Sequence, residues 1–138
     1  MSVLEEAAMQ KFAPVVLRLG LILLFFWFGF SQVASPEQWV SWVPGWVPAF
    51  THMDARVIVL LNGGFEIVGG TFLLLGLFVR SAALVLGLHL LVIAYEIGYN
   101  DIGVRDFVLA ICCFSLALFG ARDWSIMTWF SRRSETSG

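Results

Sequence analysis

Charged residues are scarce in this chain, and their scarcity argues against a soluble fold. Asp, Glu, Lys and Arg make up 13% of the 138 residues, whereas 59% are hydrophobic, and the mean hydropathy is +0.88. A soluble domain usually carries about 25% charged residues. We therefore expect a membrane-embedded protein with about four spans of roughly 20 apolar residues each. The formal net charge of −2 provides no basic surface for nucleic acid.

Residues that commonly hold redox cofactors are also few. The two cysteines, Cys112 and Cys113, are adjacent in an apolar run, so they match neither a Cys-x-x-Cys redox pair nor a metal-ligand spacing. One of the two histidines, His52, falls in a predicted loop, which disfavours a haem held by two facing histidines. The sequence shows no flavin motif and predicts no metal site. Any electrons must therefore come from a bound cofactor or from a partner protein.

Four apolar segments predict transmembrane helices within a single domain, residues 1–138. The helices are expected at about residues 15–34, 56–78, 81–97 and 104–120. Pro14 suits the first turn of the first helix, where a missing N–H is tolerated. Because the turn at 79–81 is very short, the second and third helices are expected to be antiparallel neighbours.

The one long connection, residues 35–55, is rich in tryptophan and proline. Its three prolines exclude a long continuous helix. Trp39, Trp42 and Trp46 are spaced to share one side of a short helix, and tryptophan is typical of the headgroup level. This Trp-rich loop is predicted to be interfacial, as an anchor or as a lid. The tail, residues 121–138, has apolar residues at helical spacing and predicts a cytoplasmic amphipathic helix.

Glu66 lies about midway along the second predicted span. An ionisable group at the bilayer centre costs roughly 2.5–3.5 kcal/mol on insertion scales, so such a residue is a functional-site hypothesis by default. Gly63, Glu66 and Gly70 share one helical stripe, and the glycines allow another helix to come close. We predict that Glu66 faces the interior of the bundle.

Estimated depth places the other polar residues of the spans in two layers. The inner layer combines Glu66 with His89 of the third span and Arg18 of the first, whose long side chain can reach between them. The alternatives are that Arg18 extends to nearby headgroups and that His89 is a hydrogen-bonded core histidine.

The outer layer is predicted to lie beneath the Trp-rich loop. It contains Gln32, Glu96, Arg105 and Asp106. Arg105 can pair with Glu96 across the preceding turn. The alternative role for Asp106 is to stabilise the positive end of the fourth helix from its first turn.

The distribution of basic residues predicts the orientation in the membrane. One side of the predicted bundle has six Lys and Arg residues, whereas the other has only Arg56 and Arg105. Since cytoplasmic loops carry the excess of positive charge, both termini should be cytoplasmic and the Trp-rich loop extracytoplasmic.

Several of these residues lie in runs that resemble the DoxX family. The most characteristic run is Gly64-Phe-Glu66-Ile-Val-Gly-Gly-Thr-Phe-Leu-Leu-Leu-Gly-Leu-Phe-Val-Arg80. The run Arg18-Leu-Gly-Leu-Ile-Leu-Leu-Phe is similar to the opening motif of the family, and the fourth span with Gly120-Ala-Arg122-Asp-Trp-Ser125 resembles its end signature. The resemblance implies a four-helix protein of a bacterial or archaeal inner membrane. Some members of the family are similar to the small subunit of thiosulfate:quinone oxidoreductase.

The leading hypothesis is a small membrane subunit of a redox system that binds a quinone or docks a partner oxidoreductase. Glu66 and His89 would be catalytic and exchange protons with the quinone. The ligand-binding candidates are Arg18, Gln32, Glu96, Arg105 and Asp106. The alternative is a non-catalytic scaffold or assembly partner in a larger membrane complex. The expected partners are the lipid bilayer, other oxidoreductase subunits and a second copy of the chain. A small-solute or proton carrier is a weaker third hypothesis.

Overall fold

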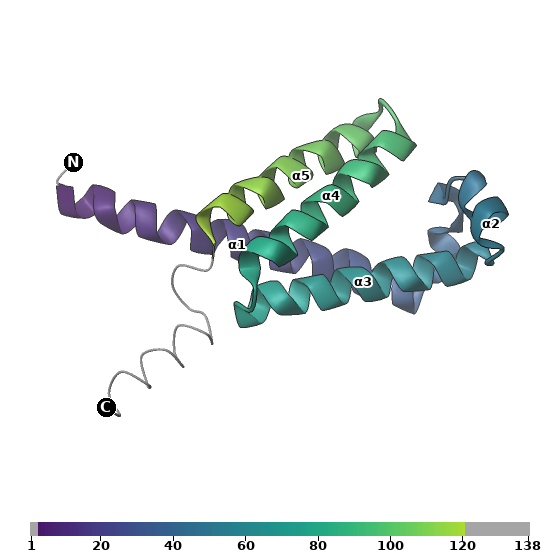
Figure 1. Ribbon diagram of the computed structural model, residues 1–138, viewed down its shortest axis with the longest axis horizontal. Helices are drawn as coiled ribbons and strands as arrows, with labels where there is room; N and C mark the ends of the chain where they lie inside the picture. Colours follow the sequence, from purple (N-terminus) through teal and green to yellow (C-terminus); the bar gives the residue numbers. More distant parts are fainter. Residues whose placement is uncertain (1–2, 121–138) are drawn as a thin grey trace.

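The computed structural model describes residues 3–120, and its described elements are helical (Figure 1). The α-helices are α1 (Val3–Ala34), α2 (Trp46–Thr51), α3 (Ala55–Leu75), α4 (Val79–Ile97) and α5 (Asp101–Phe119). Two short 3-10 helices, η1 (Pro36–Gln38) and η2 (Val40–Trp42), lie between α1 and α2. Four helices, α1 from Met9 onward, α3, α4 and α5, are long and apolar enough to cross a membrane. The predicted all-α, four-helix membrane fold is confirmed. The predicted amphipathic tail lies outside the described residues.

The first and fourth spanning helices begin earlier than the sequence indicated. The helix α1 continues through Pro14, which is buried inside it. A proline removes one hydrogen bond from a helix, and membrane helices tolerate this loss when neighbouring groups compensate. The helix α5 begins at Asp101 because Asn100 caps it, accepting hydrogen bonds of 3.0 Å from the backbone N–H groups of Ile102 and Gly103. Asp106 therefore lies beyond the first turn, and its predicted capping role is wrong.

The four spanning helices form two hairpins. The first hairpin comprises α1, the Trp-rich loop and α3, and the second comprises α4 and α5. Within each hairpin the helices pack extensively, whereas contacts between the hairpins are far fewer. Figure 1 shows α4 and α5 diverging from α1 and α3 toward the end that carries α2. The turn of residues 76–78 joins the hairpins, and Gly76 and Phe78 both adopt positive φ there.

The helices α1 and α3 touch along a glycine seam. A Cβ placed on Gly63 would lie 2.8 Å from the carbonyl oxygen of Gly29, which leaves no room for a side chain. Gly63, Glu66 and Gly70 are all buried on this face of α3. The prediction that Glu66 faces the bundle interior is confirmed.

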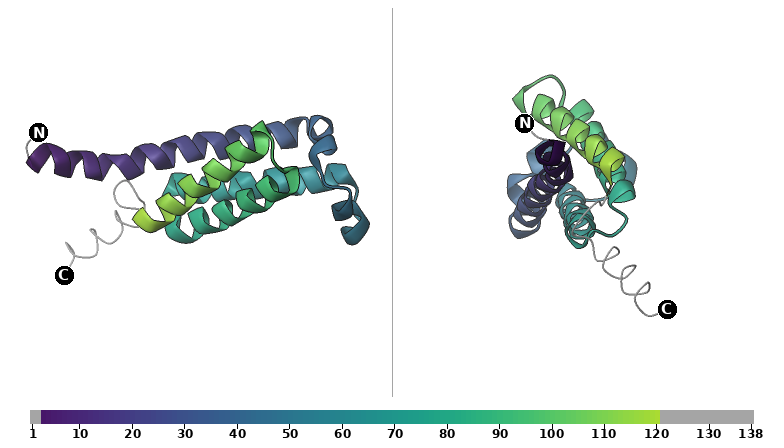
Figure 2. Two further views of the ribbon diagram at one scale, coloured as in Figure 1. Left: turned by 90° about the horizontal axis from the view of Figure 1, so that it is seen from above. Right: turned by 90° about the vertical axis from the view of Figure 1, so that its left-hand side faces the viewer.

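The hydrophobic core occupies the half of the bundle nearest the 76–78 turn. Its largest buried side chains include Phe25, Leu73, Leu86 and Leu116, one from each spanning helix. Large apolar side chains also cover the outside, such as Trp27, which is 74% exposed, and Leu118, which is 81% exposed. An apolar exterior of this extent suits contact with lipid chains. Figure 2 shows the N-terminal part of α1 extending beyond the other helices.

Candidate functional site

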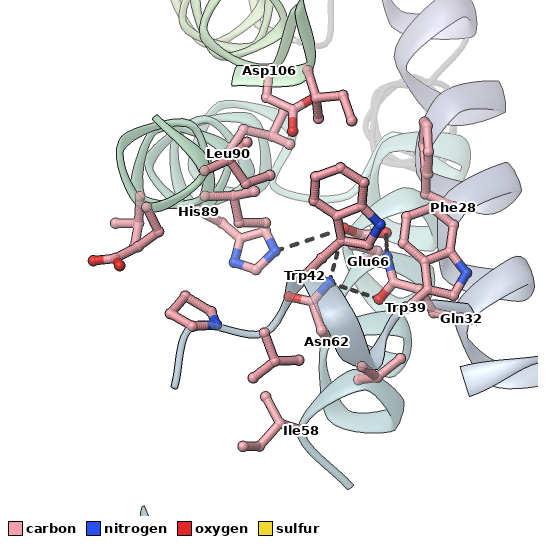
Figure 3. A pocket seen from close by; sticks show the side chains of 18 of the residues that line it. Phe28, Gln32, Trp39, Trp42, Ile58, Asn62, Glu66, His89, Leu90 and Asp106 are labelled. Carbon is pink, nitrogen blue, oxygen red and sulfur yellow. Dashed lines mark hydrogen bonds and ion pairs between the residues drawn. The ribbon is translucent and has the colours of Figure 1, made fainter. Parts of the chain in front are cut away.

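A cavity of about 490 Å³ lies between the two hairpins, next to the Trp-rich loop (Figure 3). Side chains from all four spanning helices line it, together with Trp39, Trp42 and Trp46 of the loop. The hairpins diverge at this end, so their side chains do not fill the space as they do in the core near the 76–78 turn. The volume falls within the range of about 300–1,000 Å³ that is usual for small-molecule sites.

The carboxylate of Glu66 is held by two carboxamide side chains in the cavity wall. Gln32 Nε2 donates a hydrogen bond of 3.3 Å to Glu66 Oε2, and Asn62 Nδ2 donates one of 3.2 Å to Glu66 Oε1. Asn62 Nδ2 also donates to Gln32 Oε1 at 2.8 Å, which closes a ring of three side chains. Both carboxylate oxygens act as acceptors, and the ring fixes their orientation toward α4.

His89 faces the same carboxylate from α4. Its Nε2 lies 3.8 Å from Glu66 Oε1, which is too long for a hydrogen bond. This nitrogen is buried and has no hydrogen-bond partner among the described residues. The imidazole packs against the ring of Phe65 at a centroid distance of 4.6 Å. A buried polar atom left unsatisfied costs about 1–3 kcal/mol, so a ligand oxygen that binds His89 Nε2 recovers that energy.

Two further polar contacts lie nearer the loop. Arg105 pairs with Asp106 through its Nε at 2.9 Å and a terminal nitrogen at 2.8 Å, and its guanidinium lies 5.0 Å from the ring centroid of Phe28. Glu96 accepts a hydrogen bond of 2.9 Å from Trp46 Nε1. The predicted pairing of Arg105 with Glu96 is therefore wrong, because each has a different partner.

The side chains of the Trp-rich loop contact mainly α1 and α3. Trp39 Nε1 donates to Ser31 Oγ at 3.2 Å, and its indole meets Phe28 edge-on. Glu37 forms an ion pair of 3.1 Å with Arg56. The hydrogen bond from Trp46 to Glu96 connects the loop to the second hairpin. The loop thus crosses from one hairpin to the other beside the cavity, as a lid would.

The family model for DoxX matches residues 13–98 of the chain. The chain belongs to the DoxX family. Members of this family are membrane proteins generally associated with redox or quinone-related systems. The match includes Glu66 and His89 but ends before α5, so the resemblance of the fourth span to the family's end signature lies outside it. Comparisons with curated proteins and with solved structures found no match.

This DoxX protein is a multi-pass membrane protein that contacts the lipid bilayer. Six of the seven residues singled out in the sequence line its cavity: Gln32, Glu66, His89, Glu96, Arg105 and Asp106. Gln32, Glu66 and His89 lie together, whereas Glu96 and the Arg105–Asp106 pair make separate contacts nearer the loop. Among the described residues, no group of three His, Cys, Asp or Glu side chains is placed to hold a metal ion.

Arg18 is the exception, and its predicted place beside Glu66 is wrong. The side chain is buried, but it does not line the cavity. Arg18 precedes Gln32 by about 21 Å along α1, at 1.5 Å per residue, and Gln32 is hydrogen-bonded to Glu66. An arginine side chain cannot span that distance. The glycine seam sets this register, because Gly29 lies opposite Gly63.

Asn62 is a residue of the candidate site that the sequence analysis did not single out. It lies one helical turn before Glu66, and residues four apart share a helical face. A neutral amide carries no large cost of insertion, so Asn62 does not stand out in an apolar span as an ionisable residue does. The sequence signal for Asn62 is its position one helical turn before the buried carboxyl of Glu66.

Proposed function

We propose that this DoxX protein is the quinone-binding membrane subunit of a redox system and that the cavity holds the quinone ring. The observation that carries this proposal is the facing pair of Glu66 and His89 in the wall of a largely apolar, aromatic cavity. A quinone is a flat apolar ring with oxygens that exchange protons. Phe28, Trp39 and Trp42 supply aromatic surface for such a ring, and the unsatisfied His89 Nε2 supplies a hydrogen-bond donor for one oxygen.

The side chains of the cavity suit the proton chemistry of a quinone. Reduction of a quinone to its hydroquinone consumes two electrons and two protons. In the proposal, Glu66 and His89 exchange these protons with the ring oxygens, and a partner oxidoreductase exchanges the electrons. Gln32 and Asn62 orient Glu66, while Glu96, Arg105 and Asp106 shape the cavity nearer the loop. Arg18 has no part in this scheme because it lies away from the cavity.

The proposed setting is a bacterial or archaeal inner membrane with both termini in the cytoplasm. The excess of Lys and Arg that the sequence predicts on the side away from the Trp-rich loop supports this orientation. The cavity then lies toward the extracytoplasmic side.

A scaffold role is the second candidate, and the ring of Gln32, Asn62 and Glu66 favours it. This ring ties α1 to α3, and polar contacts between membrane helices specify pairing even at about 0.6 kcal/mol each. Purification of the protein from its native membrane separates the two functions. A bound quinone in the lipid extract supports the first role, and its absence favours the second.

The direct test is the substitution Glu66→Gln in the native membrane complex. Because positioned acid–base groups contribute roughly a hundredfold or more to rate, quinone-linked turnover should fall by about that factor. The matched control is Glu6→Gln, the same change at an exposed position in the first turn of α1. Unchanged turnover in Glu66→Gln, with the protein still present in the complex, would contradict the catalytic role.

A further inference from the structure

The acceptor capacity of Glu66 determines which ligands the cavity can bind. Oε1 accepts from Asn62 and Oε2 accepts from Gln32. Two amide donors aimed at the two oxygens match the ionised form of Glu66, and in that form neither oxygen has a hydrogen to donate. A carboxylate oxygen has two acceptor positions, so Oε1 retains one beyond the bond from Asn62. The Glu66 side chain is only 5% exposed. A ligand atom that approaches this oxygen must therefore bring a hydrogen.

His89 presents the complementary group beside it. Its Nε2 is directed at Glu66 Oε1 across 3.8 Å, as Figure 3 shows. An Nε2 without hydrogen would place a lone pair against a carboxylate oxygen, so the tautomer with hydrogen on Nε2 is favoured. The cavity wall thus offers one acceptor and one donor side by side, and the donor has no hydrogen-bond partner among the described residues.

A hydroxyl oxygen satisfies both groups at once, because it donates its hydrogen to Glu66 Oε1 and accepts the N–H of His89. A quinone carbonyl oxygen only accepts, so it would bind His89 with its remaining lone pair against the carboxylate. We infer that the pair of His89 and ionised Glu66 selects the reduced, hydroxyl-bearing form of an aromatic ring ligand, a hydroquinone or phenol, over the oxidised quinone. This inference rests on the proposed function and adds to it the redox state that the cavity favours.

The size of the preference follows from the hydrogen bond that distinguishes the two forms. A hydrogen bond to a charged group corresponds to about a tenfold to a hundredfold change in affinity. Tighter binding of the reduced form raises the midpoint potential of the bound couple, by about 30 mV for each tenfold preference in a two-electron couple. The bound ring would therefore be a better electron acceptor than the free ring.

The test compares three probes on the full-length protein in detergent under anaerobic conditions. Isothermal titration calorimetry measures binding of decylhydroquinone, decylbenzoquinone and the dimethyl ether of decylhydroquinone. The hydroquinone should bind at least about tenfold more tightly than the other two. In Glu66→Gln the side chain both donates and accepts, so the affinities should become nearly equal. The control Glu6→Gln should keep the full preference.

The outcomes separate this inference from the proposed function. Equal affinities in the unsubstituted protein, or tighter binding of the quinone, would overturn the selection of the reduced form and leave a quinone site in place. Failure of all three probes to bind would remove the quinone site itself. The comparison of probes uses the unsubstituted protein, so it remains decisive even if Glu66→Gln fails to fold.

Discussion

Gly63→Ala tests the packing that places Glu66 in the cavity. A Cβ on residue 63 would lie 2.8 Å from the carbonyl oxygen of Gly29 and 2.9 Å from Cβ of Gln32, whereas ordinary contact begins at 3.4 Å. Both obstructing atoms belong to α1, and one is backbone that cannot rotate away. The two helices must therefore separate, and the bond from Gln32 to Glu66, already 3.3 Å long, is the first contact that we expect to break.

Gly64→Ala provides a matched control on the next residue of the same helix. A Cβ there meets no atom within 4 Å. Overpacking costs about 1–3 kcal/mol, whereas a glycine replaced by alanine in a helix gains about 0.5–1 kcal/mol. Because both glycines lie inside α3, that gain is common to the two variants, and they should differ by the overpacking cost alone, about 1–3 kcal/mol, with Gly63→Ala the less stable.

Thermal unfolding of the two variants in the same detergent measures this difference. Gly63→Ala should unfold at a lower temperature than the unsubstituted protein, and Gly64→Ala at the same or a higher temperature. Hydroquinone binding should also weaken in Gly63→Ala, because Gln32 no longer orients the carboxylate. Equal stability of the two variants would show that α1 and α3 do not meet at this seam, and the arrangement of the cavity would have to be revised.

Two further predictions concern the loop and the orientation. Trp46→Phe removes the N–H that binds Glu96 but keeps an aromatic ring, so ligand dissociation measured by stopped-flow should accelerate about fivefold, the equivalent of about 1 kcal/mol. Trp27→Phe is its control, since Trp27 is 74% exposed and does not line the cavity. Equal rates in both variants would show that the bond from Trp46 to Glu96 does not retain the ligand. A reporter active only outside the cytoplasm should give a signal when inserted into the Trp-rich loop and none at the C-terminus. The reverse pattern would overturn the proposed orientation.

The spans and the inward stripe of α3 could be predicted from sequence because they depend on local patterns. Apolar length identifies a membrane helix, and helical periodicity alone places Gly63, Glu66 and Gly70 on one face. The start of α1 was less clear, because a proline can begin a helix or lie within one. Whether α1 continues through Pro14 depends on how neighbouring groups pack around the proline, which cannot be read from the amino-acid composition.

The pairing of helices could not be predicted in the same way. All four spans are similarly apolar, so sequence alone does not show that α1 pairs with α3 and α4 with α5. The distance between Arg18 and Glu66 follows from that pairing and from the Gly29–Gly63 register. The partner of Arg105 depends on a choice between two nearby carboxylates, Glu96 and Asp106, and the indole of Trp46 occupies the first of these.

The joining of two well-packed hairpins by the short 76–78 turn has a consequence for evolution. Each hairpin keeps its own internal contacts if the angle between the pairs changes by a few degrees. The width of the cavity can then vary among related proteins through substitutions where the two hairpins meet, with little loss of stability within either hairpin. The size of the cavity and the thermal stability of the protein can then change independently.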